Sequence, residues 1–551
     1  MSAAPRLPVF GAGGMVASSQ CAATLVGVDV LRRGGSAVDA AIATNAALSV
    51  IEPHMCGMGG DLFALVWDPK EQALSGLNAS GRGPSGLELE ELQQLSASGS
   101  VPGRGPLSIT TPGAVDGWYQ LHDRYGRLAM AEILEPAAEL AERGVSIGES
   151  TAAAWSEAVM HLQADPVLDR ILDNFLDTFT RNSSGPQAGD VMHNPALANT
   201  FRIVGKHGRD AFYEGEIADT LSTYLKSTGA FLSTEDLATH RSEWVQPIST
   251  RYRDVDVFEL PPNGQGLCVL QMLNILENFS LDDFGRDDPR FWHAFIEAKK
   301  LAFEDRAMHY ADPDTYDAPV AALADKRYAA GRQQLIDPAH AGDSFSAGEF
   351  ALPGSDTTYL SAADADGMMV SLIQSIFSPF GSGLVAPGLG SALQSRGAGF
   401  NLHAEHPNCY APGKRPFHTI IPGFACRDGQ PWFSFGVMGA DMQPQGQVQV
   451  LMNMLDLALD PQAAGDALRL RHDGGRQPNG QHMDGLGVIQ YEKGFNQEVL
   501  AAMERMGHKL IPQKSGIAGF MGGYQGILRD NTRGTYVGAT ETRLDGMALG
   551  V

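Results

Sequence analysis

The apolar pattern of this 551-residue chain changes near residue 355, and this change constrains the fold more than any other feature. From about 115 to 345 the chain reads as largely helical, with apolar residues at helical spacing in 128–144 and 289–312. Beyond 355, short apolar runs are separated by turn residues, and Asp366-Gly367 joins two of them in the manner of a β-hairpin. Helices followed by strands, without regular βα alternation, predict a layered α+β fold.

The N-terminal segment predicts two paired helices. Ser19 is expected to cap a first helix that runs through Leu31, and Ser36 to cap a second one that ends before Pro53. A Gly-rich turn at 54–61 and two strand-like runs follow. Further along, the apolar spacing of 446–460 predicts a helix that Pro461 terminates.

Composition excludes several classes of protein. The chain carries 40 Lys and Arg against 64 Asp and Glu, and this net charge of −24 disfavours nucleic acid as a partner. Its 5 cysteines form no CxxC pair, so neither a disulfide framework nor a zinc cluster is expected. No run of about 18 apolar residues predicts a membrane span, and no secretory signal is visible. We therefore expect a cytoplasmic protein without a membrane partner.

Other short motifs carry little chemistry. The GAGG run at 11–14 follows no predicted strand and is interpreted as a turn rather than a dinucleotide loop. His403 and His406 form an HxxH pair in a loop without a third ligand, so we expect solvated histidines rather than a metal site. Asp364 and Asp366 are interpreted as hairpin-turn residues. Neither a metal nor an organic cofactor is expected.

Thr357 and Thr358 open the strand-rich part of the chain. Threonine is a good strand residue, and by itself the pair indicates nothing more. However, a threonine becomes a nucleophile when its own α-amino group is free, because that amine can accept the hydroxyl proton. The reference pKa of an α-amino group is about 7.7–8.0, so a useful fraction is unprotonated near neutral pH. Such a site requires cleavage of the chain directly before the threonine.

The chain resembles the γ-glutamyltransferase (glutathione hydrolase) family of N-terminal nucleophile hydrolases. The resemblance rests on segments that occur in the family's order: 14–61, 261–279, 356–367, 380–387 and 412–422. It implies a four-layer αββα sandwich and self-cleavage between Asp356 and Thr357. The large fragment would be 1–356 and the small catalytic fragment 357–551, associated as a heterodimer. The implied activity is cleavage of a small-molecule amide through an acyl-enzyme, whose acyl group passes to water in a hydrolase or to an acceptor amine in a transferase.

The resemblance also assigns catalytic roles. Thr357 matches the family's nucleophile, and Ser375 falls where the family has a second threonine that hydrogen-bonds it. Gly439 and Ala440 match the paired glycines whose N–H groups form the oxyanion hole. His418 and Thr419 replace two serines that contact substrate.

The donor pocket departs from the family pattern. Ser80 stands where the family has an arginine for the substrate's α-carboxylate, and Arg82 follows two residues later. Phe377 replaces an asparagine, and Arg396 and Gly399 fall in the segment that carries the family's acidic residue. An arginine repels an ammonium group and attracts a carboxylate, although a structural ion pair would explain Arg396 equally well.

These departures resemble a side branch of the family that includes oxamate amidohydrolase-like proteins. γ-Glutamyl compounds such as glutathione are the substrates that the family implies by default. An oxamate amidohydrolase-like activity, or another small-acid amidase or acylase, is the alternative that the altered pocket favours. A catalytically silent binding homologue is a third hypothesis, which the retained Thr357 and Ser375 disfavour.

Overall fold

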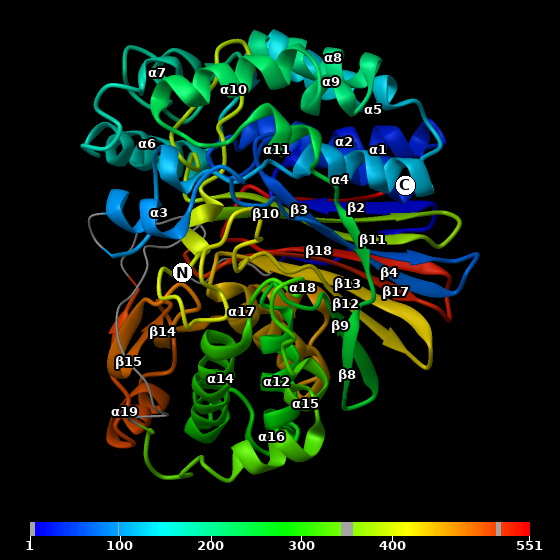
Figure 1. The fold of residues 1–551 in the computed structure, drawn as a ribbon. Coiled ribbons are helices and arrows are strands. Elements are labelled where there is room, and N and C mark those ends of the chain that lie inside the picture. Colours follow the sequence, from blue (N-terminus) through cyan, green and yellow to red (C-terminus); the bar gives the residue numbers. More distant parts are fainter. Residues whose placement is uncertain (1–5, 97–98, 343–355, 514–519) are drawn as a thin grey trace.

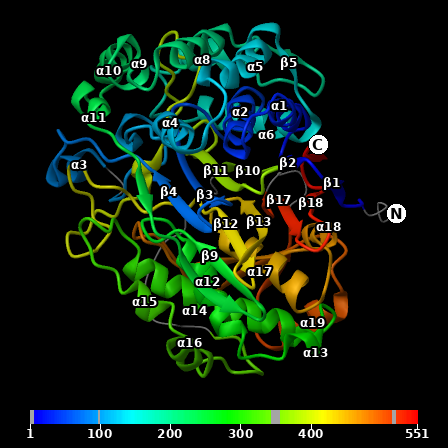
Figure 2. The ribbon, with the colours of Figure 1, turned by 90° about the vertical axis from the view of Figure 1, so that its right-hand side faces the viewer.

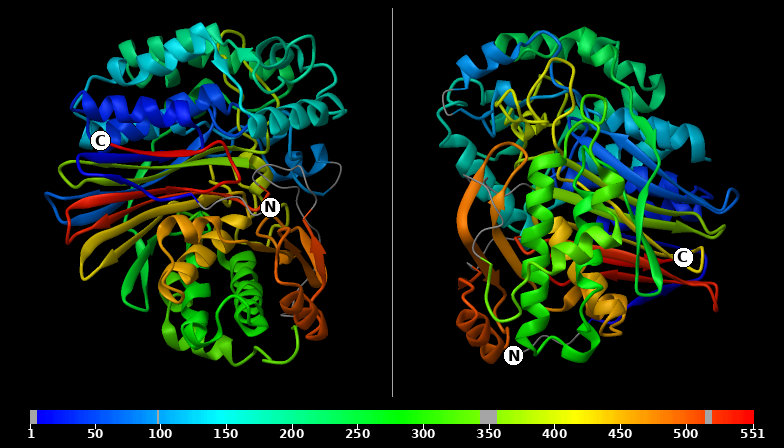
Figure 3. Two further views of the ribbon diagram at one scale, coloured as in Figure 1. Left: turned by 180° about the vertical axis from the view of Figure 1, so that it is seen from behind. Right: turned by 60° about the horizontal axis from the view of Figure 1, so that its bottom comes forward.

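The computed structural model describes residues 6–96, 99–342, 356–513 and 520–551. Within these residues, two seven-stranded sheets lie face to face, and a layer of helices covers the outer face of each sheet (Figure 1). The views from the side and from behind show the same four layers (Figures 2 and 3). The predicted α+β class and four-layer αββα sandwich are confirmed.

The first sheet holds the predicted nucleophile. Its strand order is β19 (Met547–Gly550), β2 (Gly14–Ser18), β10 (Asp356–Asp364), β11 (Met369–Phe377), β3 (Asp61–Asp68), β4 (Ala73–Ala79) and β7 (Glu243–Val245). All its pairings are antiparallel. The second sheet is also antiparallel, in the order β1 (Val9–Gly11), β18 (Thr535–Thr540), β17 (Gly523–Asp530), β13 (Gln430–Met438), β12 (Gly423–Arg427), β9 (Val255–Glu259) and β8 (Ile248–Tyr252).

Helices from the first half of the chain form the layer over the first sheet (Figure 1). They are α1 (Cys21–Arg32), α2 (Ala37–Ile51), α4 (Ala114–Tyr125), α5 (Met130–Arg143), α6 (Glu149–Gln163), α7 (Asp173–Phe179), α8 (Pro195–His207), α9 (Asp210–Tyr213), α10 (Glu216–Thr228) and α11 (Thr234–Ala238). The short helix α3 (Leu89–Leu95) lies beside the sheets and packs against Phe400 and Tyr410. The helices on the side of the second sheet are α12 (Gly266–Leu276), α13 (Leu281–Phe284), α14 (Pro289–His309), α15 (Val320–Leu323), α16 (Lys326–Gln333), α17 (Met442–Leu455) and α18 (Pro461–Asp466).

Smaller elements complete the chain. A three-stranded sheet of β14 (Leu470–Arg476), β15 (His482–Tyr491) and β16 (Leu510–Pro512) lies beside α14 with α19 (Gln497–Arg505). The strands β5 (Val145–Ser146) and β6 (Val191–Met192) pair with each other, and two short 3₁₀ turns are η1 (Pro106–Ser108) and η2 (Arg396–Gly399).

Strand alternation divides the core into layers. In β10, Leu360 packs among the helices while its neighbour Tyr359 packs between the two sheets. Successive side chains of a strand point to opposite faces, so a sheet that is covered on both sides must be apolar on both. The same alternation places Thr357 on the face of β10 that carries Tyr359, toward the second sheet.

Several expected elements are confirmed. The second N-terminal helix, α2, begins after Ser36, which forms a capping box with Asp39. The hairpin around Asp366-Gly367 joins β10 to β11. The prediction for Ser19 is wrong: Gln20 precedes α1 without a side-chain cap, and the Ser19 hydroxyl donates to Glu52 Oε2 over 2.6 Å instead.

Two further expectations need correction. The largely helical middle of the chain contains the β8–β9 hairpin, whose buried Val255 and Val257 alternate with half-buried residues. The alternation of apolar and polar residues in this hairpin is short and lies between longer helical segments, so it was not predicted from the sequence. The helix that was expected to reach Pro461 ends at Leu455, and Pro461 begins α18, where its missing N–H costs nothing.

Among the described residues, no helix combines the length and the apolar character that a membrane crossing requires. The cytoplasmic location stays a prediction.

Candidate active site

Thr357 lies at an irregular point of the central strand β10. Asp356 pairs with Phe377 and Thr358 with Gln374, so Thr357 lies opposite a β-bulge whose extra residue is in β11. Its side chain is fully buried. The side-chain amide of Gln443 donates to Thr357 Oγ1 over 3.4 Å, while Gln443 Oε1 accepts the Ile421 N–H at 3.0 Å. Bulges are common beside active sites because they redirect a side chain.

Ser375 occupies the neighbouring strand β11, close to the same bulge. It pairs with Asp61 of β3 and is fully buried. Its hydroxyl oxygen accepts the Phe377 N–H at 2.8 Å. Thr357 and Ser375, which the resemblance predicts to interact, therefore lie on adjacent strands at one end of the sheet.

The oxyanion turn, Gly439-Ala440, connects β13 to the first turn of α17. Gly439 has φ of +117° and Ala440 has φ of +51°. Their carbonyls accept the N–H groups of Met442 and Gln443 at 2.9 and 3.0 Å. Both residues precede α17, so their own N–H groups lie outside its hydrogen-bond ladder, at its positive end. Gln443 contacts both this turn and Thr357, which ties the predicted oxyanion hole to the predicted nucleophile.

Arg396 of η2 is fully buried, and its guanidinium group is only partly satisfied. Nη1 donates to Thr419 Oγ1 over 2.8 Å, and the guanidinium carbon lies 4.7 Å from the centre of the Phe377 ring. Nε and Nη2 have no hydrogen-bond partner among the described residues. Burial lowers the pKa of Arg396, and the charge of Asp61 opposes this shift. The apolar Phe377 thus provides an aromatic face for a cation.

Asp61 and His418 form a buried pair beside Arg396. Asp61 Oδ2 lies 2.9 Å from His418 Nε2, and Oδ1 accepts the N–H groups of Gly81 and Gly113 at 3.0 and 3.2 Å. Burial raises the pKa of Asp61 to about 7, against the opposing charge of Arg396. Burial, and then the charge of Arg396, hold the pKa of His418 well below its usual range. We infer a neutral imidazole whose Nδ1 has no partner among the described residues.

Ser80 is held in a polar network. Its hydroxyl donates to Asn78 Oδ1 over 2.6 Å and accepts from Asn263 Nδ2 at 3.2 Å. The backbone oxygen of Ser80 accepts from Arg415 Nε at 3.2 Å. Ser80 therefore offers no cation of its own for a carboxylate.

Arg82 is engaged by three carboxylates. Its guanidinium group lies 3.2 Å from Glu243, 3.4 Å from Asp312 and 2.6 Å from Asp314, and its side chain is one third exposed. Substrate contacts by Ser80 and Arg82 stay predictions.

One buried cluster could hold a metal ion. The ligand atoms of His293, Glu297 and His508 lie within 4.8 Å of one another. However, His293 Nδ1 is 2.8 Å from His508 Nε2, and Lys300 Nζ donates to Glu297 Oε1 over 2.7 Å. The protein's own groups thus satisfy this cluster. The HxxH pair remains apart from it: His403 is exposed, and His406 Nε2 contacts the Ala307 carbonyl oxygen at 3.0 Å.

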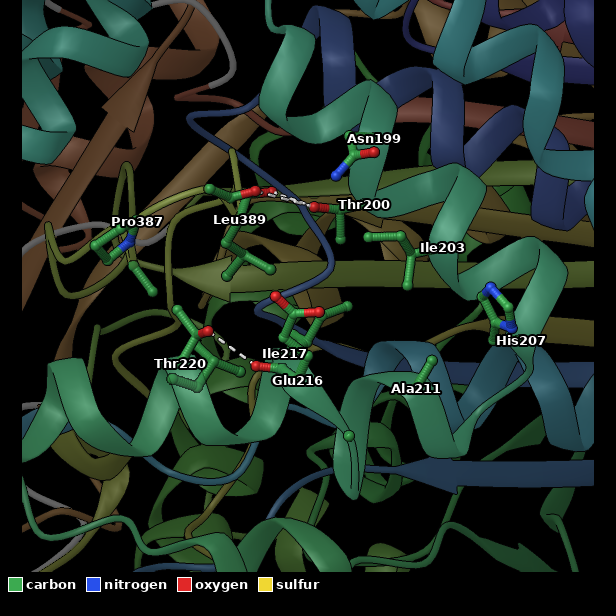
Figure 4. Close-up of a pocket in the computed structure, with 14 residues that line it drawn as sticks. Asn199, Thr200, Ile203, His207, Ala211, Glu216, Ile217, Thr220, Pro387 and Leu389 are labelled. Carbon is green, nitrogen blue, oxygen red and sulfur yellow. Dashed lines mark hydrogen bonds between the residues drawn. The ribbon is translucent and has the colours of Figure 1, made fainter.

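A pocket of about 380 Å³ lies between α8, α10 and the loop 386–389 (Figure 4). Ile203, Ile217 and Leu389 supply apolar parts of its wall, and the Thr200 hydroxyl donates to the Leu389 carbonyl over 3.0 Å. None of the site residues predicted from the sequence lines this pocket.

Sequence reasoning missed three site residues. Asp61 ends the Gly-rich turn at 54–61 and begins the buried strand β3. An acidic residue at the start of a buried strand is a usable signal of a functional residue. Gln443 and Gln265 carry no such signal, because each acts through a contact with a residue distant in sequence: Gln443 donates to Thr357, and the Gln265 amide donates to the Ala440 carbonyl over 2.9 Å.

Comparisons with known proteins agree over nearly the whole chain. It is 34% identical over 550 residues to the glutathione hydrolase-like YwrD proenzyme of Bacillus subtilis, covering 98% of this chain and 99% of that one. It is 32% identical to the oxamate amidohydrolase proenzyme of Klebsiella pneumoniae, covering 98% of both. The crystal structure of a cephalosporin acylase from Bacillus halodurans superposes with a TM-score of 0.90 at 40% identity, over 100% of this chain and 98% of that one.

The two sequence relatives are named as proenzymes of hydrolases and the solved structure as an acylase, which supports amide-cleaving enzymatic activity here. The sequence model of the gamma-glutamyltranspeptidase family matches residues 23–551. This chain therefore belongs to the γ-glutamyltranspeptidase family.

Proposed function

We propose that the chain cleaves itself between Asp356 and Thr357 and then uses Thr357 as the N-terminal nucleophile of an amidase. One observation carries the proposal: Thr357 lies buried opposite the bulge of β11, and Gln443 joins its hydroxyl to the oxyanion turn. A nucleophile beside backbone N–H donors is the arrangement that acyl transfer requires.

The reaction follows from these groups. The freed α-amine of Thr357 accepts the hydroxyl proton while Oγ1 forms a bond to the amide carbon. The N–H groups of Gly439 and Ala440 stabilise the oxyanion, and removal of one such donor typically costs about 10²–10³ in kcat. The C–N bond then breaks, the leaving amine takes the proton, and an ester to Thr357 remains. Water hydrolyses this acyl-enzyme with the α-amine as base, which releases the acid and regenerates Thr357.

The two fragments, 1–356 and 357–551, would remain associated after cleavage. In the first sheet, β10 and β11 of the small fragment lie between β2 and β3 of the large fragment. In the second sheet, β1, β8 and β9 of the large fragment flank strands of the small one. Separation would expose the edges of these strands and the apolar side chains packed between the two sheets. The cost of this exposure supports a stable heterodimer.

For the substrate, we propose a small acyl group that carries a carboxylate, as in the monoamide of a dicarboxylic acid. The support is the buried Arg396, whose Nε and Nη2 lack partners among the described residues, next to the Thr419 hydroxyl. A γ-glutamyl group would bring an ammonium toward this cation, and Ser80 offers no anchor for its α-carboxylate. We expect glutathione to be a poor substrate.

The self-cleavage is tested on a denaturing gel. The purified protein should give two bands, and Edman sequencing of the smaller should begin Thr-Thr-Tyr-Leu. Thr357→Ala should remain one uncut, inactive chain. An intact wild-type chain with full activity would overturn the proposed nucleophile.

The substrate class is tested by mass-spectrometric comparison of four amides: glutathione, a γ-glutamyl anilide, oxamate and a glutaryl amide. The last two should be cleaved with the higher kcat/KM. Efficient cleavage of glutathione, with no turnover of either monoamide, would return the protein to the activity that its family implies by default.

A further inference from the structure

Gln265 belongs to neither the oxyanion turn nor the segment around Thr419, but its side chain contacts both. It precedes α12 and is fully buried. Its single amide nitrogen donates to the Thr419 carbonyl over 2.6 Å and to the Ala440 carbonyl over 2.9 Å. An amide nitrogen has two hydrogens, so these two bonds use its full donor capacity. The Gln265 side chain therefore connects the oxyanion turn to Thr419, whose hydroxyl accepts a hydrogen bond from Arg396.

Arg306 of α14 fixes the orientation of this amide. Arg306 Nη1 donates to Gln265 Oε1 over 2.5 Å and to Asp441 Oδ1 over 2.8 Å. Because the amide oxygen must face this cation, the nitrogen must face the two carbonyls. Gln477 closes the network by contacting both Arg306 and Asp441.

The oxyanion turn needs such support. Ala440 has φ of +51°, a left-handed conformation that a residue with a Cβ adopts at a cost of roughly 1–2 kcal/mol. Strained backbone persists only where the surroundings determine it. Here the Ala440 carbonyl accepts both the Gln265 amide and the Gln443 N–H. These two bonds fix the peptide that follows the oxyanion donors.

We propose that Gln265, oriented by Arg306, is a positioning residue that holds the oxyanion turn in its strained, catalytically competent conformation. The inference rests on the proposed function, since it assumes that the Gly439 and Ala440 N–H groups stabilise the oxyanion. It also assigns a task to the large fragment: Gln265 and Arg306 belong to 1–356, whereas the turn belongs to 357–551. The catalytic geometry of the small fragment thus depends on its partner fragment.

Gln265→Glu tests the role with little change of shape. The variant keeps an oxygen for Arg306 but replaces the donor with an acceptor that faces two carbonyls. In fully processed enzyme, counted by active-site titration, kcat should fall about ten- to a hundredfold, whereas KM should change by less than about threefold. Gln265→Leu, which also loses the donor, should show the same split and serves if the first variant fails to fold.

A double-mutant cycle with Ala440→Gly separates positioning from general stability. Glycine adopts the left-handed conformation without the steric cost of a Cβ atom. In the Ala440→Gly enzyme, the turn should therefore depend less on the hydrogen bond from the Gln265 amide. The loss of kcat caused by Gln265→Glu should be at least fivefold smaller in the A440G enzyme. An equal loss in both enzymes would overturn the proposal, as would a Gln265→Glu kcat within twofold of wild type.

Gln449→Glu is the matched control. The Gln449 amide also bridges two carbonyls, those of Gln445 and Leu470, but it contacts neither the oxyanion turn nor Thr419. This variant should lower the melting temperature and leave kcat within about twofold; a loss of kcat equal to that of Gln265→Glu would contradict a specific role. Failure of the proposed function is distinguishable, because an active Thr357→Ala enzyme would refute the nucleophile whatever the cycle gives.

Discussion

The two halves of the site differ in how far the protein satisfies its own polar groups. In the nucleophile half (Thr357, Ser375 and the oxyanion turn), Gln443 and Gln265 use both their amide oxygen and their amide nitrogen. In the recognition half (Arg396, Thr419, His418 and Asp61), Arg396 Nε and Nη2 and His418 Nδ1 have no partner among the described residues.

A buried donor without a partner costs about 1–3 kcal/mol, and more when the group is charged. A fold that satisfies one half of a site and leaves the other incomplete indicates where a ligand supplies the missing contacts. In the nucleophile half, the side-chain amides of Gln443 and Gln265 are satisfied because the geometry must be fixed before substrate arrives, and the backbone N–H groups of the oxyanion turn are kept for the oxyanion. We propose that the acyl group of the substrate completes the recognition half.

Removing the cation should produce the largest effect. Arg396→Met keeps the apolar length and removes the partner of the substrate carboxylate. Hydrogen bonds to charged groups contribute about 1.5–3 kcal/mol, so kcat/KM for a glutaryl anilide should fall about ten- to a hundredfold. For the matched neutral valeryl anilide it should change by less than about threefold.

This pair of anilides decides what Arg396 does. A selective loss for the charged substrate supports recognition. Equal losses for both substrates, together with a lower melting temperature, would show that Arg396 only stabilises the fold, and the two halves would no longer differ in purpose.

Removing one hydroxyl from the nucleophile half should have a similar or smaller effect. Ser375→Ala loses a group that lies beside the bulge and accepts the Phe377 N–H. Loss of positioning should lower kcat about tenfold and alter KM less. The loss of kcat should be the same for charged and neutral anilides, because the nucleophile half does not contact the variable part of the acyl group. Ser375→Thr restores the hydroxyl and should recover most of kcat; an unchanged kcat in Ser375→Ala would remove Ser375 from the site.

Asp61 joins the halves, and its titration should change the pH dependence of stability. Its pKa is raised to about 7 by burial, so the folded state binds a proton that the unfolded state has already lost. The associated stability is fully present below about pH 4 and is lost as pH rises to about 7. Relative to Asp61→Asn, the wild type should therefore lose stability by up to about 1.4 kcal/mol per pH unit over this window.

Urea unfolding of both proteins between pH 5 and pH 8 measures this difference. It should shift in favour of Asp61→Asn up to about pH 7 and then become constant. Asp441 provides the control: burial raises its pKa, but Arg306 outweighs burial and holds the pKa at about 2. The difference between wild type and Asp441→Asn should be flat over the same range. A flat difference for Asp61→Asn would contradict a raised pKa.

The sequence predicted the local features well. The Ser36 cap depends on a residue three positions away, and the hairpin at Asp366-Gly367 on adjacent turn residues, so both follow from short-range preferences. The bulge at Thr357 was not predicted, because it results from the register between β10 and β11.

Prediction of the site was uneven for the same reason. The resemblance assigned roles to residues within continuous motifs, such as Thr357 and the oxyanion turn, and these roles stay predictions. It did not reveal the role of Gln265, although this residue lies in the resembling segment 261–279, or the role of Arg306, because both act through contacts more than a hundred residues away in the chain. Nor could it show that Arg82 would be engaged by carboxylates while Arg396 kept unpaired nitrogen atoms.

The central claim is that a freed Thr357 carries the acyl group. Intact-mass spectrometry of the enzyme, quenched in acid during turnover of a slow glutaryl amide, tests it most directly. We expect the glutaryl mass on the small fragment alone, located by peptide mapping at its N-terminal Thr357, and absent from the uncut Thr357→Ala chain. An acyl group on any other residue, or on an uncleaved active chain, would contradict the account.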